Sequence, residues 1–172
     1  MYKRIFISCL FIFSLCQCQK KYQDENEITD ERVGNIIIGA SKSDVLSKLE
    51  MYKLENLGGS VQTYYKVFNA NNELLLSLEF LENKLWAIQV HHKKYYTNNE
   101  ISVGDIAFDI KLKGYANMIL ASKNYLYSQK GNIFLFFEKK ITKSGEIDEE
   151  AKLTSITVGN IFNINNMPFI CL

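Results

Sequence analysis

Cysteine is the residue type in this chain with the widest range of possible chemistry. A thiol can be acylated, can form a disulfide, or can bind a metal ion once it loses its proton. Three of the four cysteines fall within the first eighteen residues, and the fourth is the second-last residue. They are Cys9, Cys16, Cys18 and Cys171. Their chemistry therefore depends on what the N-terminal segment does.

Residues 1–17 have the composition of a secretory signal peptide. Lys3 and Arg4 form a short positive start, and an apolar run follows over Ile5–Leu15. A helix of that length reaches only about 16 Å, well short of the ~30 Å hydrocarbon core of a membrane. The alternative is a buried N-terminal strand or helix, but the run shows no amphipathic pattern. We therefore expect a signal peptide over residues 1–17.

The segment Leu15-Cys16-Gln17-Cys18 resembles a bacterial lipobox, in which a cysteine is acylated and becomes the new N-terminus. Leu15 stands three residues before Cys18, as in that motif, whereas Gln17 replaces the small residue that is usual there. Cys18 is the predicted lipidation site and Cys16 the alternative. Two or three acyl chains hold a protein on a membrane, since each buried methylene contributes about 0.8 kcal/mol. The resemblance implies a location in the cell envelope, at the outer membrane, facing the periplasm or the cell surface.

Removal of residues 1–17 changes both the thiol count and the charge. Lys3 and Arg4 are lost, so 20 basic residues become 18 against 19 acidic ones, a net charge of −1. With Cys18 acylated, Cys171 is the one remaining thiol, and no intramolecular disulfide can form. The chain has no long basic block, which argues against a nucleic-acid partner.

The polar stretch 18–32 is predicted to be a flexible tether between lipid and domain. After Cys18 it reads QKKYQDENEITDER, with too few apolar residues to offset the entropy of ordering. Its charged residues have an alternative interpretation, a sorting signal for surface lipoproteins. At the other end, residues 163–172 are predicted to be an irregular C-terminal tail.

Between these ends the sequence contains an internal tandem repeat. We predict repeat 1 over residues 33–96 and repeat 2 over residues 97–162. Three blocks match in the same order. The pairs are IIIGASKSDV (36–45) with ISVGDIAFDI (101–110), LLLSLE (74–79) with IFLFFE (133–138), and LWAIQV (85–90) with LTSITV (153–158).

Each unit is predicted to be a helix followed by three antiparallel strands. Ser41 and Asp105 are the candidate N-caps of the two helices. Strands are predicted over 61–70, 74–80 and 85–92, and then over 120–129, 133–139 and 153–161. The strand over 133–139 is apolar on both sides, which predicts that it is buried. One unit alone buries a marginal core, so we expect two to share one. The predicted fold is α+β, with two tandem repeats sharing one sheet and both helices on one face.

The matched motif resembles the small α/β modules of bacterial envelope lipoproteins, among them the small lipoprotein of the outer-membrane barrel-assembly machinery. In tandem, it is similar to the β-lactamase-inhibitor-protein fold. The resemblance covers about residues 33–160 and implies a fold and a binding role. It transfers no site residue, because the matched positions are structural.

Motifs for catalysis, metals and cofactors are missing from the sequence. His91 and His92 are adjacent, so on a strand they point to opposite faces and cannot hold one metal ion together. The chain has no Gly-x-Ser-x-Gly elbow and no phosphate-binding loop. We therefore expect a protein that is not an enzyme and has no metal or cofactor.

Aromatic residues on predicted strands are the one indication of a binding surface. Tyrosine and tryptophan combine a large contact area with a polar group and are enriched in interfaces. The candidate binding residues are Tyr64, Tyr65, Trp86, Tyr125 and Tyr127. The favoured function is a lipid-anchored inhibitor, immunity factor or assembly accessory that binds a protein or envelope partner through an open sheet face. The alternatives are a structural envelope lipoprotein without a ligand, in which these rings pack inside, and a cryptic hydrolase.

Overall fold

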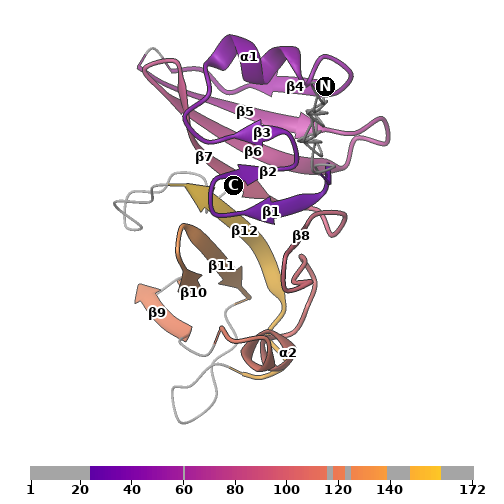
Figure 1. Ribbon diagram of the computed structural model, residues 1–172, viewed down its shortest axis with the longest axis vertical. Helices are drawn as coiled ribbons and strands as arrows, with labels where there is room; N and C mark the ends of the chain where they lie inside the picture. The colour runs from indigo at the N-terminus through magenta and orange to yellow at the C-terminus, as the bar shows by residue number, and fades with distance from the viewer. Residues whose placement is uncertain (1–23, 60, 116–117, 123–124, 139–147, 160–172) are drawn as a thin grey trace, which may run out of the picture.

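The computed structural model describes residues 24–59, 61–115, 118–122, 125–138 and 148–159 (Figure 1). The predicted signal peptide, both candidate lipidation sites, Cys16 and Cys18, the first part of the tether and the C-terminal tail lie outside the described residues. Within the described ranges, no helix has the length and apolar character that crossing a membrane requires.

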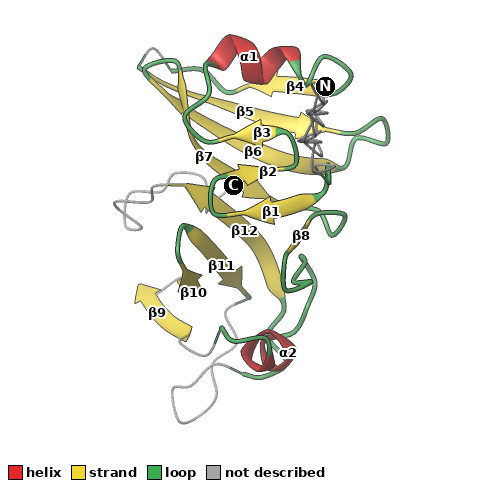
Figure 2. Ribbon diagram, viewed as in Figure 1, coloured by secondary structure: helices red, strands yellow, loops and turns green. Residues whose placement is uncertain are grey.

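Most of the described chain is β-strand, and its largest element is an eight-stranded antiparallel sheet (Figure 2). Its strand order is β4-β5-β6-β7-β12-β11-β10-β9, so β7 pairs with β12 at the centre. The strands are β4 (Lys53–Asn56), β5 (Gln62–Phe68), β6 (Leu74–Leu81), β7 (Lys84–Val90), β9 (Met118–Ser122), β10 (Tyr125–Lys130), β11 (Ile133–Phe137) and β12 (Leu153–Gly159).

A second, smaller sheet of four short strands lies in front of the large one in the view of Figure 1. Its order is β3-β2-β1-β8, and β1 pairs with β8 in parallel although the two are far apart in sequence. The strands are β1 (Glu27–Thr29), β2 (Arg32–Val33), β3 (Ile36–Ile37) and β8 (Tyr96–Thr97). The ordered domain therefore begins before residue 33, inside the stretch predicted to be a tether.

The two helices are short and stand at opposite ends of the molecule (Figure 1). Helix α1 (Lys42–Ser47) and helix α2 (Ala107–Leu112) have six residues each. Ser41 caps α1 as predicted, and its hydroxyl accepts a hydrogen bond from the Asp44 amide at 3.2 Å. The prediction that Asp105 caps α2 is wrong, because the N-cap is Ile106 and the Asp105 carboxylate accepts from the Ser102 amide at 3.0 Å.

The predicted fold class is therefore wrong. The protein is mainly β, with two sheets and two short helices, and it is not a pair of helix-plus-three-strand units. The segment 53–56 follows α1 and forms the edge strand β4, where the prediction had no strand. In the segments before α1, Ile28 and Val33 are only 1% exposed. The burial of these apolar side chains stabilises the second sheet, which the prediction lacked.

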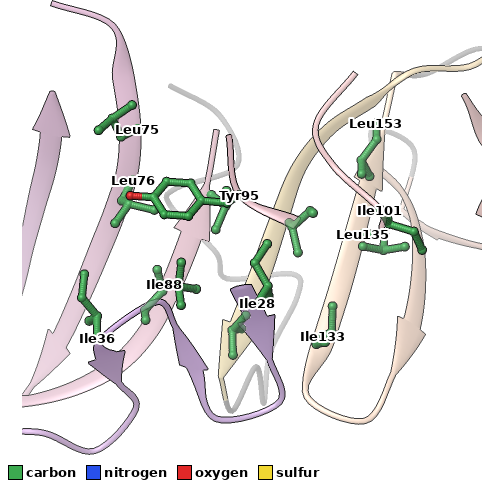
Figure 3. Packing of buried hydrophobic residues seen from close by; sticks show 14 of the residues in the cluster. Ile28, Ile36, Leu75, Leu76, Ile88, Tyr95, Ile101, Ile133, Leu135 and Leu153 are labelled. Atoms are coloured by element: carbon green, nitrogen blue, oxygen red, sulfur yellow. The ribbon is translucent and has the colours of Figure 1, made fainter. Parts of the chain in front are cut away.

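The hydrophobic core lies between the small sheet and one face of the large sheet. Figure 3 shows Ile28 and Ile36 of the small sheet in the same cluster of buried side chains as Leu76 and Ile88 of the large sheet. Full burial of such a side chain contributes about 1.5–3 kcal/mol. The helices close the core at its two ends, α1 through Val45 and α2 through its own buried residues.

Candidate binding face

The five aromatic residues predicted to bind a partner do not form one cluster. Tyr65 belongs to the core side of the large sheet, where its ring packs edge-on against Phe80 at 5.8 Å. Trp86 is half-buried on β7, next to an irregularity in the β6–β7 register. Tyr125 is the first residue of β10, and its side chain lies outside the described part of the structure.

Tyr64 and Tyr127 lie on the opposite face, which we call the outer face of the large sheet. Strand pairing brings Lys66, Ser77, Gln89, Thr157 and Phe134 into one row across β5, β6, β7, β12 and β11. Since side chains alternate along a strand, the residues two positions away share this face. The outer face comprises Tyr64, Lys66, Ser77, Glu79, Ala87, Gln89, Tyr127, Gln129, Phe134, Phe136, Ser155 and Thr157.

The small sheet and both helices direct their buried side chains into the core, on the side away from the outer face. None of the outer-face residues belongs to the hydrophobic core cluster. Strands β6, β7 and β12 alternate apolar and polar residues around Ser77, Gln89 and Thr157. Side chains on both faces are buried in the middle of these strands, so the partly exposed residues of the outer face lie nearer its margins.

The centre of the outer face is a strip of short polar side chains, which we call the polar strip. It consists of Ser77, Gln89, Ser155 and Thr157, each 4–7% exposed. The Gln89 Nε2 amide donates a hydrogen bond to Ser155 Oγ at 2.9 Å. Gln89 Oε1 is buried and finds no hydrogen-bond partner within the described part of the chain. Leaving such an acceptor unsatisfied costs about 1–3 kcal/mol.

A serine–histidine pair stands at one side of the polar strip. Ser77 Oγ and His91 Nε2 are 2.9 Å apart. Burial, together with the positive charge of Lys66, lowers the pKa of His91 to about 4, so the imidazole is neutral at pH 7. A catalytic dyad also needs an orienting acid, and no carboxylate of the described residues is hydrogen-bonded to this imidazole.

His92 has different partners from its neighbour. Its Nδ1 accepts a hydrogen bond from the Lys94 amide at 3.1 Å, and its Nε2 lies 3.8 Å from the Glu73 carboxylate. Among the residues that the structure describes, no group of three or more His, Cys, Asp or Glu side chains could hold a metal ion.

Ionisable and aromatic side chains flank the polar strip on its two sides. On the β5 side, burial raises the pKa of Glu79, and the Gln62 amide donates a hydrogen bond to its carboxylate. Burial and the nearby Glu79 raise the pKa of Tyr64. Tyr64 and Tyr127 are five strands apart, which at about 4.8 Å per strand is roughly 24 Å. The outer face is therefore a broad surface.

On the β10 side the flank is aromatic. The Tyr127 ring packs against Phe134 at 6.2 Å and against Phe136 at 6.1 Å, both in tilted geometry. The two phenylalanines are 5% and 3% exposed, whereas Tyr127 is half-buried. Tyr127 is therefore the ring of this group that remains accessible for contact.

A pocket of about 360 Å³ lies elsewhere, between the small sheet and the start of β11. Its walls include Asp30 and Glu31, and also Glu27, whose carboxylate is paired with Arg32 at 2.5 Å. Neither histidine lines it. The serine–histidine pair and this pocket are therefore separate features.

Sequence reasoning missed the polar strip, although the signal was present. Ser77 interrupts the apolar run LLLSLEF, and Gln89 and Thr157 each occupy an alternate position of a predicted strand. Polar residues at alternate positions of two strands that pair would have marked a common face.

Comparison with known proteins identifies the fold and no function. No protein-family model matches the chain, and no curated protein matches it. One similar solved structure is the crystal structure of the uncharacterized protein yfeY from Escherichia coli, with a TM-score of 0.59 and 13% sequence identity. The match covers 78% of this chain and 99% of that one. The chain thus shares the fold of a small bacterial protein, at an identity too low to carry a function.

Proposed function

We propose that this protein is a lipid-anchored component of the bacterial cell envelope that binds a partner protein, without catalysis, through the outer face of its large sheet. The observation that carries the proposal is the pair of half-buried tyrosines Tyr64 and Tyr127, which border the polar strip on its two sides. Tyrosine combines a large contact area with a polar group and is enriched in interfaces.

The proposed anchor is the acylated Cys18, with Cys16 as the alternative acceptor. The lipobox-like residues Leu15–Cys18 support it, together with the charged start and apolar run before them. Residues 19–26 separate that cysteine from β1, a length that lets the domain stand clear of the headgroups. The proposed location is the outer membrane, on its periplasmic or cell-surface side.

The composition of the outer face supports binding over a purely structural role. Interfaces combine aromatic side chains with hydrogen-bonding groups that lie away from charge. Here Tyr64 and Tyr127 border a polar strip that holds hydroxyl groups and one carboxamide. The finer resemblance to barrel-assembly lipoproteins and to the β-lactamase-inhibitor-protein fold suggests an inhibitor, an immunity factor or an assembly accessory.

A hydrolase is the second candidate, because Ser77 and His91 are within hydrogen-bonding distance. The arrangement favours a structural role for this pair. Ser77 is 4% exposed, and the pocket described above does not include it. A base with a pKa of about 4 is also poorly matched to proton transfer at neutral pH.

The test is cross-linked capture from envelope extract with the full chain in detergent. The bait carries a photo-cross-linker at Gln129, an exposed position of the outer face. A Tyr64→Ala/Tyr127→Ala variant removes the two accessible rings, and Phe108→Ala removes an exposed ring from α2 as the matched control. Thermal unfolding verifies that each variant is folded.

We expect one protein to cross-link to the bait with the natural face and to the Phe108→Ala control. The same protein should be lost, by at least about tenfold, from the double variant. Equal capture by all three baits would show that the outer face is not the site. The absence of any cross-linked protein would favour the structural envelope lipoprotein. Turnover of an ester substrate that depends on Ser77 would favour the hydrolase.

A further inference from the structure

The two edges of the large sheet differ in chemistry. An edge strand carries backbone N–H and C=O groups that can pair with another strand, and proteins protect such edges with charges, proline or short length. The edges here are β4, which reads KLEN, and β9, which reads MILAS. Only β4 carries charged residues.

Strand β4 is protected in the way that is usual for an edge. Lys53 and Glu55 are both exposed, and either charge would have to be desolvated if another strand paired with β4. The Lys53 ammonium also lies 5.6 Å from the centre of the Phe68 ring and donates a hydrogen bond to Asn72 at 2.9 Å. Pairing at this edge would disturb these contacts.

Strand β9 lacks every one of these protections except short length. Its five residues contain no charge, no proline and no glycine, and three consecutive residues, Met118, Ile119 and Leu120, are large and apolar. In the described part of the chain, β9 pairs with β10 alone, with Ile119 opposite Tyr127. Among the residues that the structure describes, no strand pairs with the other side of β9.

We propose that two copies of this chain associate through β9, edge to edge and antiparallel. A two-fold axis through the middle of the strand brings β9 against its own copy and joins the two large sheets into one. Because the strand carries no charge, this self-pairing places no like charges opposite one another. The protected edge β4 stops further addition, so the assembly closes at two copies.

The association is expected to be weak and reversible. Five paired residues bury less area than the roughly 1,600 Å² of a standard stable interface. We therefore expect dimers at concentrations of about 10–100 µM in solution. The inference is independent of the proposed function, because strands that pair at an edge do so through backbone groups and not through the outer face.

Hydrogen exchange of the natural full chain in detergent tests the proposal without any substitution. Amides of residues 118–122 should exchange at least about threefold more slowly at about 100 µM than at about 1 µM protein. The β4 amides, residues 53–56, serve as the internal control and should exchange at the same rate at both concentrations. Protection of β9 that does not depend on concentration would overturn the proposal.

Two lysine substitutions on neighbouring strands test the location. Ile119→Lys adds a charge to β9, and Gln129→Lys adds the same charge to β10, one strand inside the edge. Sedimentation should show self-association weakened by at least about tenfold in Ile119→Lys and by less than about threefold in Gln129→Lys. A single-chain mass for the natural protein at every concentration, or equal effects of the two lysines, would contradict pairing through β9.

Discussion

Ser77 and His91 join the strand β6 to the residue that follows β7, through a hydrogen bond of 2.9 Å at the side of the polar strip. The Ser77 side chain is almost fully buried, and Lys66 lies opposite it on β5. The imidazole is thus held neutral in a place where a second positive charge would be unfavourable. Two measurable consequences follow from this face.

The first consequence is a dependence of stability on pH. The pKa of His91 is about 4 in the folded chain and 6.5 in the unfolded one, so acid protonates the unfolded chain first. The contribution of neutral His91 to the free energy of unfolding is complete above about pH 6.5, and it is lost as the pH falls toward 4. Relative to His91→Gln, the natural protein should lose about 2 kcal/mol of unfolding free energy between pH 7 and pH 5.

Urea unfolding of both proteins at the two pH values gives this difference directly. The raised pKa of Glu79 makes its contribution to stability increase as the pH falls, opposite to that of His91. Glu79 is present in both proteins, so its contribution cancels in the comparison. A difference that stays constant from pH 7 to pH 5 would show that the imidazole titrates normally and is not buried as described.

The second consequence concerns Gln89. Replacing Gln89 with leucine and Ser155 with alanine removes the unpaired acceptor Oε1 and both partners of the hydrogen bond, so that neither partner is left unsatisfied. Because the unpaired acceptor costs more than a single hydrogen bond contributes, Gln89→Leu/Ser155→Ala should raise the unfolding free energy by about 1 kcal/mol. Chemical denaturation measures the change. A destabilised variant would mean that Oε1 is satisfied within the isolated protein.

Gly159 is the last residue of β12 and pairs with Ala87 of β7. A Cβ there would lie 2.4 Å from the Trp86 carbonyl oxygen, and its φ of +138° is unfavourable for any other residue. Gly159→Ala should therefore lose about 3 kcal/mol of stability through strain and overpacking. Gly39→Ala, at φ +84° with no atom within 4 Å, should lose only about 1 kcal/mol. Equal losses in thermal or urea unfolding would show that the β7–β12 pairing adjusts freely.

The anchor is tested at the two cysteines. Cys18→Ala should abolish incorporation of labelled palmitate and move the protein from the membrane fraction to the soluble one, because the acceptor thiol is gone. Cys16→Ala should leave both the palmitate incorporation and the membrane location unchanged. Loss of label from Cys16→Ala alone would identify Cys16 as the acceptor, and absence of label from the natural chain would refute lipidation.

Four central strands were predictable from local sequence. The predicted ranges 74–80, 85–92, 133–139 and 153–161 coincide closely with β6, β7, β11 and β12. These segments are rich in apolar residues and are bounded by turn residues, so the local pattern and tertiary packing agree.

The smaller sheet was not predictable in this way. Its strands have two or three residues each, and β1 pairs with β8 across nearly seventy residues of chain. Such short segments have no periodicity of their own to detect. They become strands because Ile28, Val33 and Ile36 are buried against the large sheet.

The sequence by itself determined the charged start and apolar run of the N-terminal segment and the positions of the central strands, since these depend on neighbouring residues. Only the tertiary structure decided which side of each strand is buried. Tyr64 and Tyr65 are adjacent and identical in type, yet one lies on the outer face and the other packs on Phe80. The physical reason is that a strand presents its two faces equally, and only contacts with distant segments distinguish them.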